Sequence, residues 1–313
     1  MGRLRFRRQK ANGGRPPWSS DGAGPVPGWS QPAPFRSCVV PPRTIAELPL
    51  EGVGALVQQL PFGDLGNPRD VAVDTAGNVY VADFRPGCGV SKLAVGASGA
   101  VRLPFGDLAA LAIAVDSVGA VYASGRDLSG RPRWLKLAPG DSEPTELPLP
   151  PLAHPADLTV DTADNLYVID WENNDILKLQ AHDGSLVRIP VHDTYDFRGL
   201  TVDSAGIIYL TADAAGIERG NNWVFKLSPG TDQPAQLPFS GLNYGHGIEV
   251  DAAGDLYVAD NWAGRIVKLT TDGTLGVQLA FPHIQGATSV AVDAGGNVYA
   301  PLPIDRRVLT LSG

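Results

Sequence analysis

Two short apolar runs separated by a small polar turn recur along this chain. The first copy, residues 70–83, reads Asp-Val-Ala-Val-Asp-Thr-Ala-Gly-Asn-Val-Tyr-Val-Ala-Asp. Runs rich in β-branched residues on either side of a turn of Asp, Gly and Asn predict a β-hairpin. We expect Asp74 to accept hydrogen bonds from the backbone that follows it, and Gly77 or Asn78 to take a positive φ.

The hairpin returns five more times at a nearly fixed spacing. Each copy is anchored by an aspartate, and these are Asp74, Asp116, Asp161, Asp203, Asp251 and Asp293. A repeat of about 40 to 45 residues built from short strands is typical of the blades of a β-propeller.

Each copy also contains a third and, in five cases, a fourth apolar run. The third runs are residues 90–93, 134–137, 176–179, 224–227, 266–269 and 308–311. The fourth runs, which mostly contain Leu-Pro, are residues 100–105, 144–149, 186–191, 234–239 and 276–281. Proline within such a run indicates an edge strand.

The sixth copy ends without a fourth run, while residues 56–62, before the first hairpin, have the same Leu-Pro-Phe pattern. This predicts an all-β, six-bladed β-propeller of four-stranded antiparallel blades over residues 44–313. We expect the N-terminal strand to close the last blade, because this pairs an edge that would otherwise stay open.

Composition restricts the partners of this ring. The net charge of −8 and the isoelectric point near 5.1 disfavour binding to nucleic acid. Residues 1–43 are basic at their start and rich in Pro, Gly and Ser, so we expect a disordered tail. Two interpretations of the tail stay open. The tail is either a solubilising extension or a start placed too early, without a specific role, or it is a polybasic segment that contacts an acidic surface.

The sequence has neither an apolar secretory signal nor a run of some 20 apolar residues. We therefore expect no transmembrane segment and a cytoplasmic location, or an extracytoplasmic one if the start is misplaced. The two cysteines, Cys38 and Cys88, give no disulfide framework.

The repeat resembles the NHL repeat, in residues 68–83 and again in Asn-Asn-Asp-Ile-Leu-Lys-Leu at 173–179. It is similar in particular to the propeller that forms the extracytoplasmic sensor domain of actinobacterial receptor serine/threonine kinases, whose units carry a Leu-Pro-Phe strand before each hairpin. The resemblance covers residues 56–311 and implies a sensor or scaffold role. It implies no kinase activity, because the glycine-rich loop, His-Arg-Asp and Asp-Phe-Gly are missing from the sequence.

Departures from the repeat indicate where a ligand could bind. The residue five positions before the aspartate is, in blade order, Arg69, Leu111, Ala156, Arg198, His246 and Thr288. The residue four positions before it is Asp70, Ala112, Asp157, Gly199, Gly247 and Ser289. In a propeller these positions rim one end of the central channel, so their mixed charge favours a ligand-binding face. Drift at solvated positions is the alternative.

Inside the strand, the residue two before the aspartate is Ala or Thr in five copies and Glu249 in the fifth blade. With His246, this carboxylate could hold a metal or act as acid and base, although one His and one Glu are a poor metal set. A channel carboxylate paired with an arginine or with water is the alternative.

Trp171 and Trp262 follow the second strand of their hairpins. They fit either a recognition surface or packing between blades. Extended loops at residues 124–133 and 212–222 are further places for specificity.

Two functions remain open. The first is a non-catalytic, monomeric module, without metal or cofactor, that binds an unidentified protein or small molecule. Its candidate ligand-binding residues are Arg69, Asp70, Asp157, Trp171, Arg198, His246, Glu249 and Trp262. The second is a metal-dependent lyase or lactonase, similar in architecture to streptogramin lyase and the gluconolactonase-like proteins, with a site at the channel mouth near His246 and Glu249.

Overall fold

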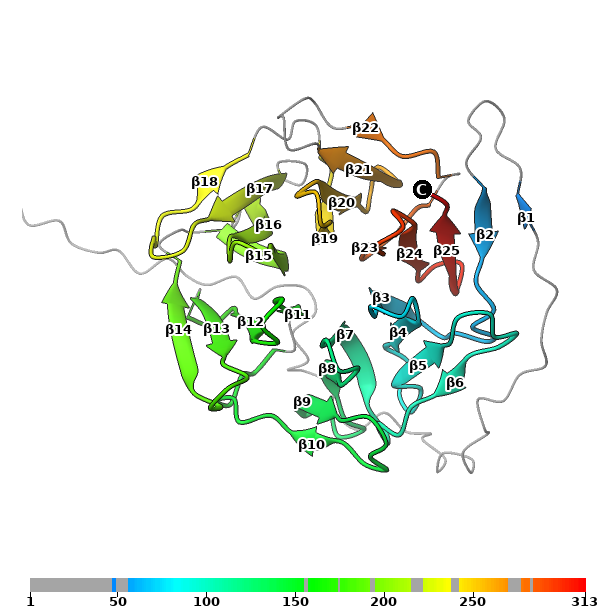
Figure 1. Ribbon diagram of the computed structural model, residues 1–313, viewed down its shortest axis with the longest axis horizontal. Coiled ribbons are helices and arrows are strands. Elements are labelled where there is room, and N and C mark those ends of the chain that lie inside the picture. Colours follow the sequence, from blue (N-terminus) through cyan, green and yellow to red (C-terminus); the bar gives the residue numbers. More distant parts are fainter. Residues whose placement is uncertain are drawn as a thin grey trace, which may run out of the picture. The chain divides into compact units, whose positions relative to one another are not determined.

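Six antiparallel sheets surround a common axis in this computed structural model (Figure 1). The structure describes residues 56–154, 157–173, 175–191, 195–214, 222–237, 242–269, 277–281 and 284–313, together with the backbone of residues 47–48. No helix occurs in these ranges. The predicted six-bladed, all-β propeller is confirmed, while the expected basic tail lies outside the described residues.

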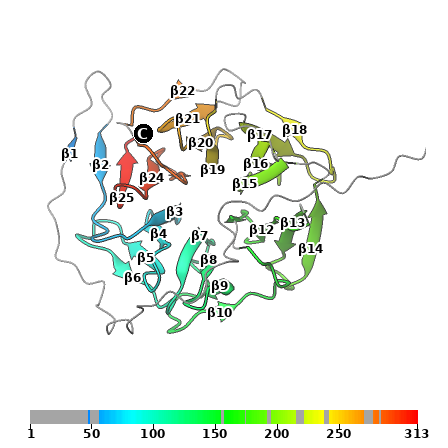
Figure 2. The ribbon, with the colours of Figure 1, turned by 180° about the vertical axis from the view of Figure 1, so that it is seen from behind.

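Each blade begins with the strand nearest the axis and proceeds outward, as both faces of the ring show (Figures 1 and 2). The first blade contains β3 (Pro68–Val73), β4 (Val79–Asp83), β5 (Val90–Leu93) and β6 (Val101–Arg102). The second contains β7 (Ala109–Val115), β8 (Val121–Arg126), β9 (Pro132–Leu137) and β10 (Thr145–Glu146). The third contains β11 (Leu158–Val160), β12 (Leu166–Asp170), β13 (Asp175–Leu179) and β14 (Leu186–Pro190).

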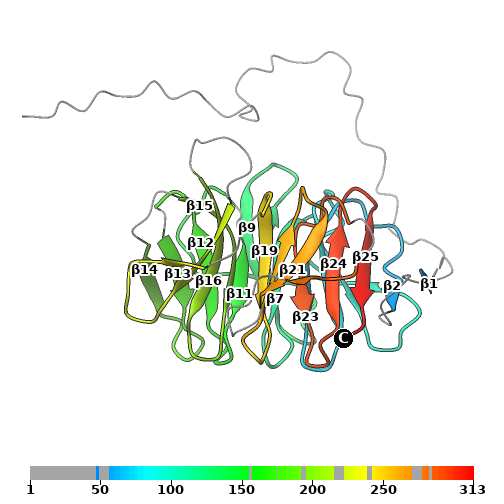
Figure 3. The same cartoon turned by 90° about the horizontal axis from the view of Figure 1, so that it is seen from above.

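The fourth blade contains β15 (Tyr195–Val202), β16 (Ile208–Ala214), β17 (Asn222–Leu227) and β18 (Ala235–Gln236). The fifth contains β19 (Gly245–Val250), β20 (Leu256–Asp260), β21 (Arg265–Leu269) and β22 (Val277–Gln278). The sixth contains β23 (Ala291–Val292), β24 (Val298–Leu302) and β25 (Arg307–Leu311). Seen from the side, strands such as β23, β24 and β25 run from one face of the ring toward the other (Figure 3).

The N-terminal strand closes the ring as predicted. Strand β2 (Val57–Gln59) pairs with the C-terminal strand β25, so that Val57 lies opposite Leu311. An unpredicted short strand, β1 (Glu47–Leu48), pairs with the outer edge of β2 and makes the sixth sheet five-stranded.

The outer strands are shorter than the sequence predicts. Four of the five span two residues. In the first, second and fifth blades the chain turns sharply just after the short strand, at the residue that follows Leu103, Leu147 and Leu279. The amide of Phe105 donates to the Leu103 carbonyl at 2.8 Å, two residues earlier, and Phe281 donates to Leu279 in the same way. This hydrogen bond is that of a γ-turn. The turn directs the buried Phe105 and Phe281 back into the core.

The repeated aspartate organises each hairpin turn. In the first blade Asp74 Oδ1 accepts the amides of Ala76 at 3.0 Å and Asn78 at 2.8 Å, as expected. Gly77 takes the positive φ of 82°. Asp74 Oδ2 accepts the hydroxyl of Tyr80 at 2.9 Å. The same tyrosine bond recurs in the other five blades, from Tyr122, Tyr167, Tyr209, Tyr257 and Tyr299.

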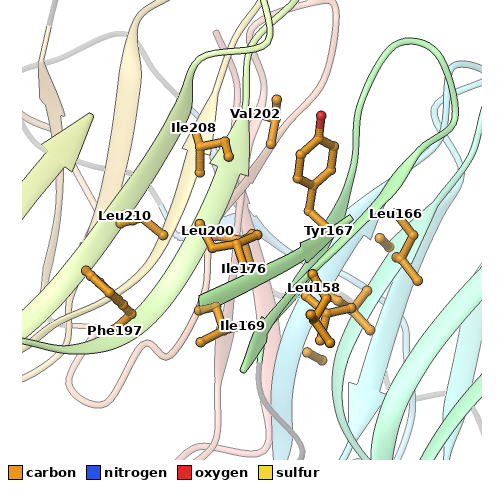
Figure 4. Packing of buried hydrophobic residues seen from close by; sticks show 14 of the residues in the cluster. Leu158, Leu166, Tyr167, Ile169, Ile176, Phe197, Leu200, Val202, Ile208 and Leu210 are labelled. Atoms are coloured by element: carbon orange, nitrogen blue, oxygen red, sulfur yellow. The ribbon is translucent and has the colours of Figure 1, made fainter. Parts of the chain in front are cut away.

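Apolar side chains fill the space between blades. The largest cluster joins the second, third and fourth blades, and Figure 4 shows its part from the third and fourth. Ile176, Leu210 and Phe197 have at most 1% of their surface exposed. This packing fixes neighbouring blades to each other and thereby positions the loops around the axis. In the part of the chain that the structure describes, we find no helix of the length and apolarity that crossing a bilayer requires.

Candidate functional site

Irregular pairing in the inner strands positions the rim residues. The register between inner and second strands shifts at Arg69 in β3, at Leu111 in β7 and at Arg198 in β15. In β19 the shift spans His246 and Gly247. A β-bulge re-aims the side chain at the extra residue. In these four blades the bulge therefore explains why the position five before the aspartate faces the axis.

These residues converge on one cavity of about 150 Å³, which we call the mouth cavity. It is lined by Arg69, Asp70, Leu111, Ala112, Asp157, Trp171, Arg198, His246, Gly247, Thr288 and Ser289. All six blades contribute to it. Six of the eight candidate ligand-binding residues thus meet in one place, whereas Glu249 and Trp262 lie elsewhere.

The two arginines of the mouth cavity differ in their partners. Arg198 Nε donates to Asp213 Oδ2 at 2.7 Å, and its guanidinium lies 5.4 Å from the centre of the Trp171 ring and 5.9 Å from that of Tyr244. Arg69 has a buried Nε without a hydrogen-bond partner among the described residues. Burial lowers the pKa of Arg69, because desolvation disfavours the charged guanidinium. Its charge is therefore poorly compensated.

His246 stays neutral in this setting. Burial and then the charges of Arg198 and Arg69 lower its pKa to about 4. The imidazole ring centre lies 6.0 Å from that of Tyr244. A hydrogen bond with the Thr288 backbone opposes this lowering of the pKa, and at neutral pH the imidazole adds no charge to the mouth cavity.

Asp70 links three blades at the floor of the mouth cavity. Its Oδ2 accepts the amide of Ile113 in β7 at 2.7 Å, and its Oδ1 accepts the amide of Val71 at 2.8 Å and the hydroxyl of Ser289. Burial raises the pKa of Asp70 to about 6, against the opposing effect of these hydrogen bonds. The carboxyl group therefore links the first blade to the second and the sixth.

Asp157 does the same between the third and fourth blades. Its oxygens accept the amides of Leu158 at 3.1 Å and Leu200 at 2.9 Å. Burial, followed by the nearby charges of Asp70 and Glu249, raises the pKa of Asp157 well above its usual value.

A second cavity, of about 170 Å³, continues along the axis, and we call it the channel cavity. It shares Asp70, Asp157, Gly247 and Ser289 with the mouth cavity. Glu249 lines it together with Ala72, Ala114, Thr159 and Ala291 of the same register, while Val, Ile and Leu residues make up most of the remaining lining. Glu249 Oε1 accepts the amide of Val250 at 3.0 Å and the Thr201 hydroxyl at 3.1 Å. Burial raises the pKa of Glu249 to about 7.

His246 and Glu249 therefore face the axis at different levels, one in the mouth cavity and the other in the channel cavity. Within the described ranges no three His, Cys, Asp or Glu side chains are placed to share one metal ion. The residues we can describe do not form the metal site suggested above, and we derive no metal-dependent step.

Trp171 and Trp262 are both on the surface, with 36% and 47% of their area exposed. Neither is enclosed between blades. Trp171 lines the mouth cavity, whereas the Trp262 ring packs against Tyr244 at 5.5 Å between ring centres. Most of the loop at residues 212–222 lies outside the described residues, while the one at 124–133 largely extends β8 and β9.

Two buried aspartates at the end of second strands, Asp83 in β4 and Asp260 in β20, have a loop-holding role that the sequence did not predict. Asp83 accepts the amides of Gly66 at 2.7 Å and Asn67 at 2.9 Å, just before β3. Asp260 accepts the amide of Asn243 at 2.7 Å, just before β19. Asp83 and Asp260 thus hold the loops that lead into β3 and β19. The sequence shows that they share one slot of the repeat, but it does not show which amides they accept.

The fold and the axial cavities define the class of protein: a six-bladed β-propeller with a ligand-sized opening at one end of its channel. No family model and no curated protein matches the chain. Similar solved structures include a gluconolactonase from Xanthomonas campestris, with a TM-score of 0.64 and 14% identity over 88% of this chain and 99% of that one.

Two further similar structures are enzymes with different activities. One is virginiamycin B lyase from Staphylococcus aureus, with a TM-score of 0.53 and 15% identity over 82% of this chain and 81% of that one. The other is the PQQ-bound aldose sugar dehydrogenase from Streptomyces coelicolor, with a TM-score of 0.58 and 15% identity over 88% of this chain and 99% of that one. At such identities the likeness shows the fold alone.

Proposed function

We propose that this propeller is a non-catalytic, monomeric module that binds a small molecule in the mouth cavity. One observation carries the proposal: residues that break the repeat, including Arg69, Arg198 and His246, line a single solvent-connected cavity. A cavity of about 150 Å³ holds a group the size of a benzene ring. The resemblance of the repeat to NHL-type sensor domains supports a sensing rather than a chemical role.

A ligand screen tests this proposal. Saturation-transfer NMR with a set of anionic, cationic and neutral ring compounds is compared between the parent protein and Leu111→Trp, which fills the mouth cavity without changing its charge. We expect some compounds to bind the parent and to be lost in the variant. Val118→Trp is the matched control, since Val118 is 70% exposed in a hairpin turn. Binding that survives Leu111→Trp unchanged would refute a site in the mouth.

An enzymatic function is the second candidate, and a specific observation favours it. Glu249 and Asp70, with pKa values raised to about 7 and about 6, both line the channel cavity, and perturbed carboxyl groups concentrate at active sites. The solved structures similar to this chain include a lactonase and a lyase.

Acid release from simple aldonolactones, followed in a pH-stat with EDTA or with added divalent metal, separates the two functions. The binding proposal predicts no turnover above the uncatalysed rate under either condition. Turnover that is lost in Glu249→Gln would establish the enzyme instead.

A further inference from the structure

We propose that the ligand of the mouth cavity is a small organic carboxylate whose apolar body is about the size of one aromatic ring, with its carboxylate bound by Arg69. The inference rests on the proposed function, because it names the chemical class of ligand for the same cavity. It follows from the charge balance of the mouth and from the shape of its walls.

Arg69 needs a partner that the described residues do not supply. Its Nε is buried without a hydrogen-bond acceptor among the described residues, and the ring centre of Phe84 lies 5.9 Å from its guanidinium carbon. Burying a charged group without a partner is costly. A carboxylate offers two acceptor oxygens in the plane that a guanidinium fork requires, so it restores the missing hydrogen bonds.

The charges around Arg69 favour an anion over a cation. Arg198 adds a second guanidinium, already positioned by Asp213, and both arginines act on His246. Asp70 and Asp157 also line the cavity, but both oxygens of each accept backbone amides. Both oxygens of each carboxyl group thus already have partners in the protein, whereas the Arg69 Nε has none among the described residues.

The walls fix the size and polarity of the rest of the ligand. Leu111, Ala112 and the ring of Trp171 face the cavity. The volume of about 150 Å³ accommodates one ring next to the carboxylate.

Benzoate is the probe that tests the inference, and calorimetry measures its affinity. We expect benzoate to bind the parent at least tenfold more tightly than benzamide, which has the same shape without the charge, and than acetate, which has the charge without the ring. Phenyl phosphate reports whether a phosphate replaces the carboxylate, and binding tighter than that of benzoate would overturn the carboxylate assignment.

Arg69→Gln should weaken benzoate binding by about tenfold to a hundredfold, because one charge-assisted contact is lost. Arg102→Gln is the control, as Arg102 lies on the outer strand β6 and should leave the affinity unchanged. If the Gln variant does not fold, Arg69→Lys replaces it as the test variant. It keeps the charge but lacks the fork, so we expect an intermediate loss. Equal affinity for benzoate in the parent and either Arg69 variant would refute the inference.

Leu111→Trp separates failure of this inference from failure of the proposed function. If benzamide binds as well as benzoate and both are lost in Leu111→Trp, the mouth cavity is the ligand site but the carboxylate assignment is wrong. If no probe responds to Leu111→Trp, the mouth is not the ligand site and both proposals fall.

Discussion

Glu249 occupies a position where the other five inner strands have Ala or Thr. Its carboxyl group lines the channel cavity, and burial raises its pKa from 4.5 to about 7. Between these pH values the unfolded chain has lost the proton and the folded chain retains it. Ionisation of Glu249 therefore lowers the free energy of unfolding as the pH rises from about 4.5 through 7.

Glu249→Gln should remove this penalty. The amide oxygen of Gln can still accept the Val250 amide and the Thr201 hydroxyl, while the ionisable proton is gone. We expect the variant to be more stable than the parent at pH 8 by up to about 3 kcal/mol, with no difference below pH 4.5. Urea unfolding between pH 4 and 8 measures this. Glu143→Gln, at an exposed position, should leave the pH profile unchanged, and an identical profile for Glu249→Gln would show that Glu249 ionises without cost.

His246 contributes pH dependence of the opposite sign. Its pKa of about 4 in the folded protein lies below the ordinary value of 6.5, so it adds stability as the pH rises between these values. Comparison of the parent with a Glu249 variant cancels this effect, since both contain His246.

The rim residues could be predicted from the sequence because they break a sixfold repeat. Arg69, Arg198 and His246 stand in one register with Leu111 and Thr288, and the fold brings this register to one cavity. The partners of these residues could not be predicted. Asp213 lies 15 residues from Arg198, at the end of the neighbouring strand, and no repeat marks it. The contact with Asp213 gives Arg198 a partner, whereas Arg69 Nε has none among the described residues.

At the scale of the single blade, the aspartate–tyrosine bond joins the hairpin turn to its second strand. The hydroxyl-to-carboxylate distances lie between 2.8 and 3.1 Å in all six blades. In four blades a lysine of the third strand lies over the tyrosine ring, 4.7 to 4.9 Å from its centre. The sequence predicts the role of the aspartate and the turn. It shows that the tyrosine recurs in a strand, but it does not predict the hydrogen bond from this tyrosine to the aspartate.

Removal of this hydroxyl should cost about 1 kcal/mol of unfolding free energy in any blade. Tyr80→Phe and Tyr209→Phe belong to the first and fourth blades and share no partner. We expect their effects on chemical denaturation to add within about 0.5 kcal/mol. A double variant that loses much more than the sum would show that the blades are coupled through these turns.

Neighbouring blades approach each other closely at the axis, and this explains why position 247 is a glycine. A Cβ on Gly247 would lie 2.5 Å from the Ser289 Cα of the sixth blade, and the Gly247 amide donates to the Thr288 carbonyl at 3.1 Å. The first and third blades have an aspartate at this position, but the fifth has no room for one.

Gly247→Ala should therefore destabilise the protein by about 1–3 kcal/mol, because backbone atoms of two blades must separate. Gly99→Ala is the matched control: it has open space around its Cβ, and we expect it to be neutral or slightly stabilising. Thermal melts of the two variants check this. An unchanged melting temperature for Gly247→Ala would mean that the fifth and sixth blades can move apart at no cost.

At the scale of the whole molecule, the ring depends on a strand contributed from the opposite end of the chain. Strand β2 pairs with β25, and Val57, 1% exposed, packs in a cluster with Leu309 and Leu311. The sequence predicted this closure because residues 56–62 share the pattern of the outer strands. It did not predict β1, since two residues are too few to show a period.

A chain that starts at residue 63 should lose this closure. The outer edge of β25 would then expose unpaired amides and carbonyls, so we expect a lower melting temperature and concentration-dependent association in sedimentation experiments. Val57→Asp in the full chain keeps the backbone of β2 but buries a charge, so it should lower the melting temperature while adding less association. Gln58→Asp, at a half-buried position of the same strand, should have a much smaller effect. A truncated chain that melts like the parent and stays monomeric would show that the first blade and the end of the sixth hold the ring closed by themselves.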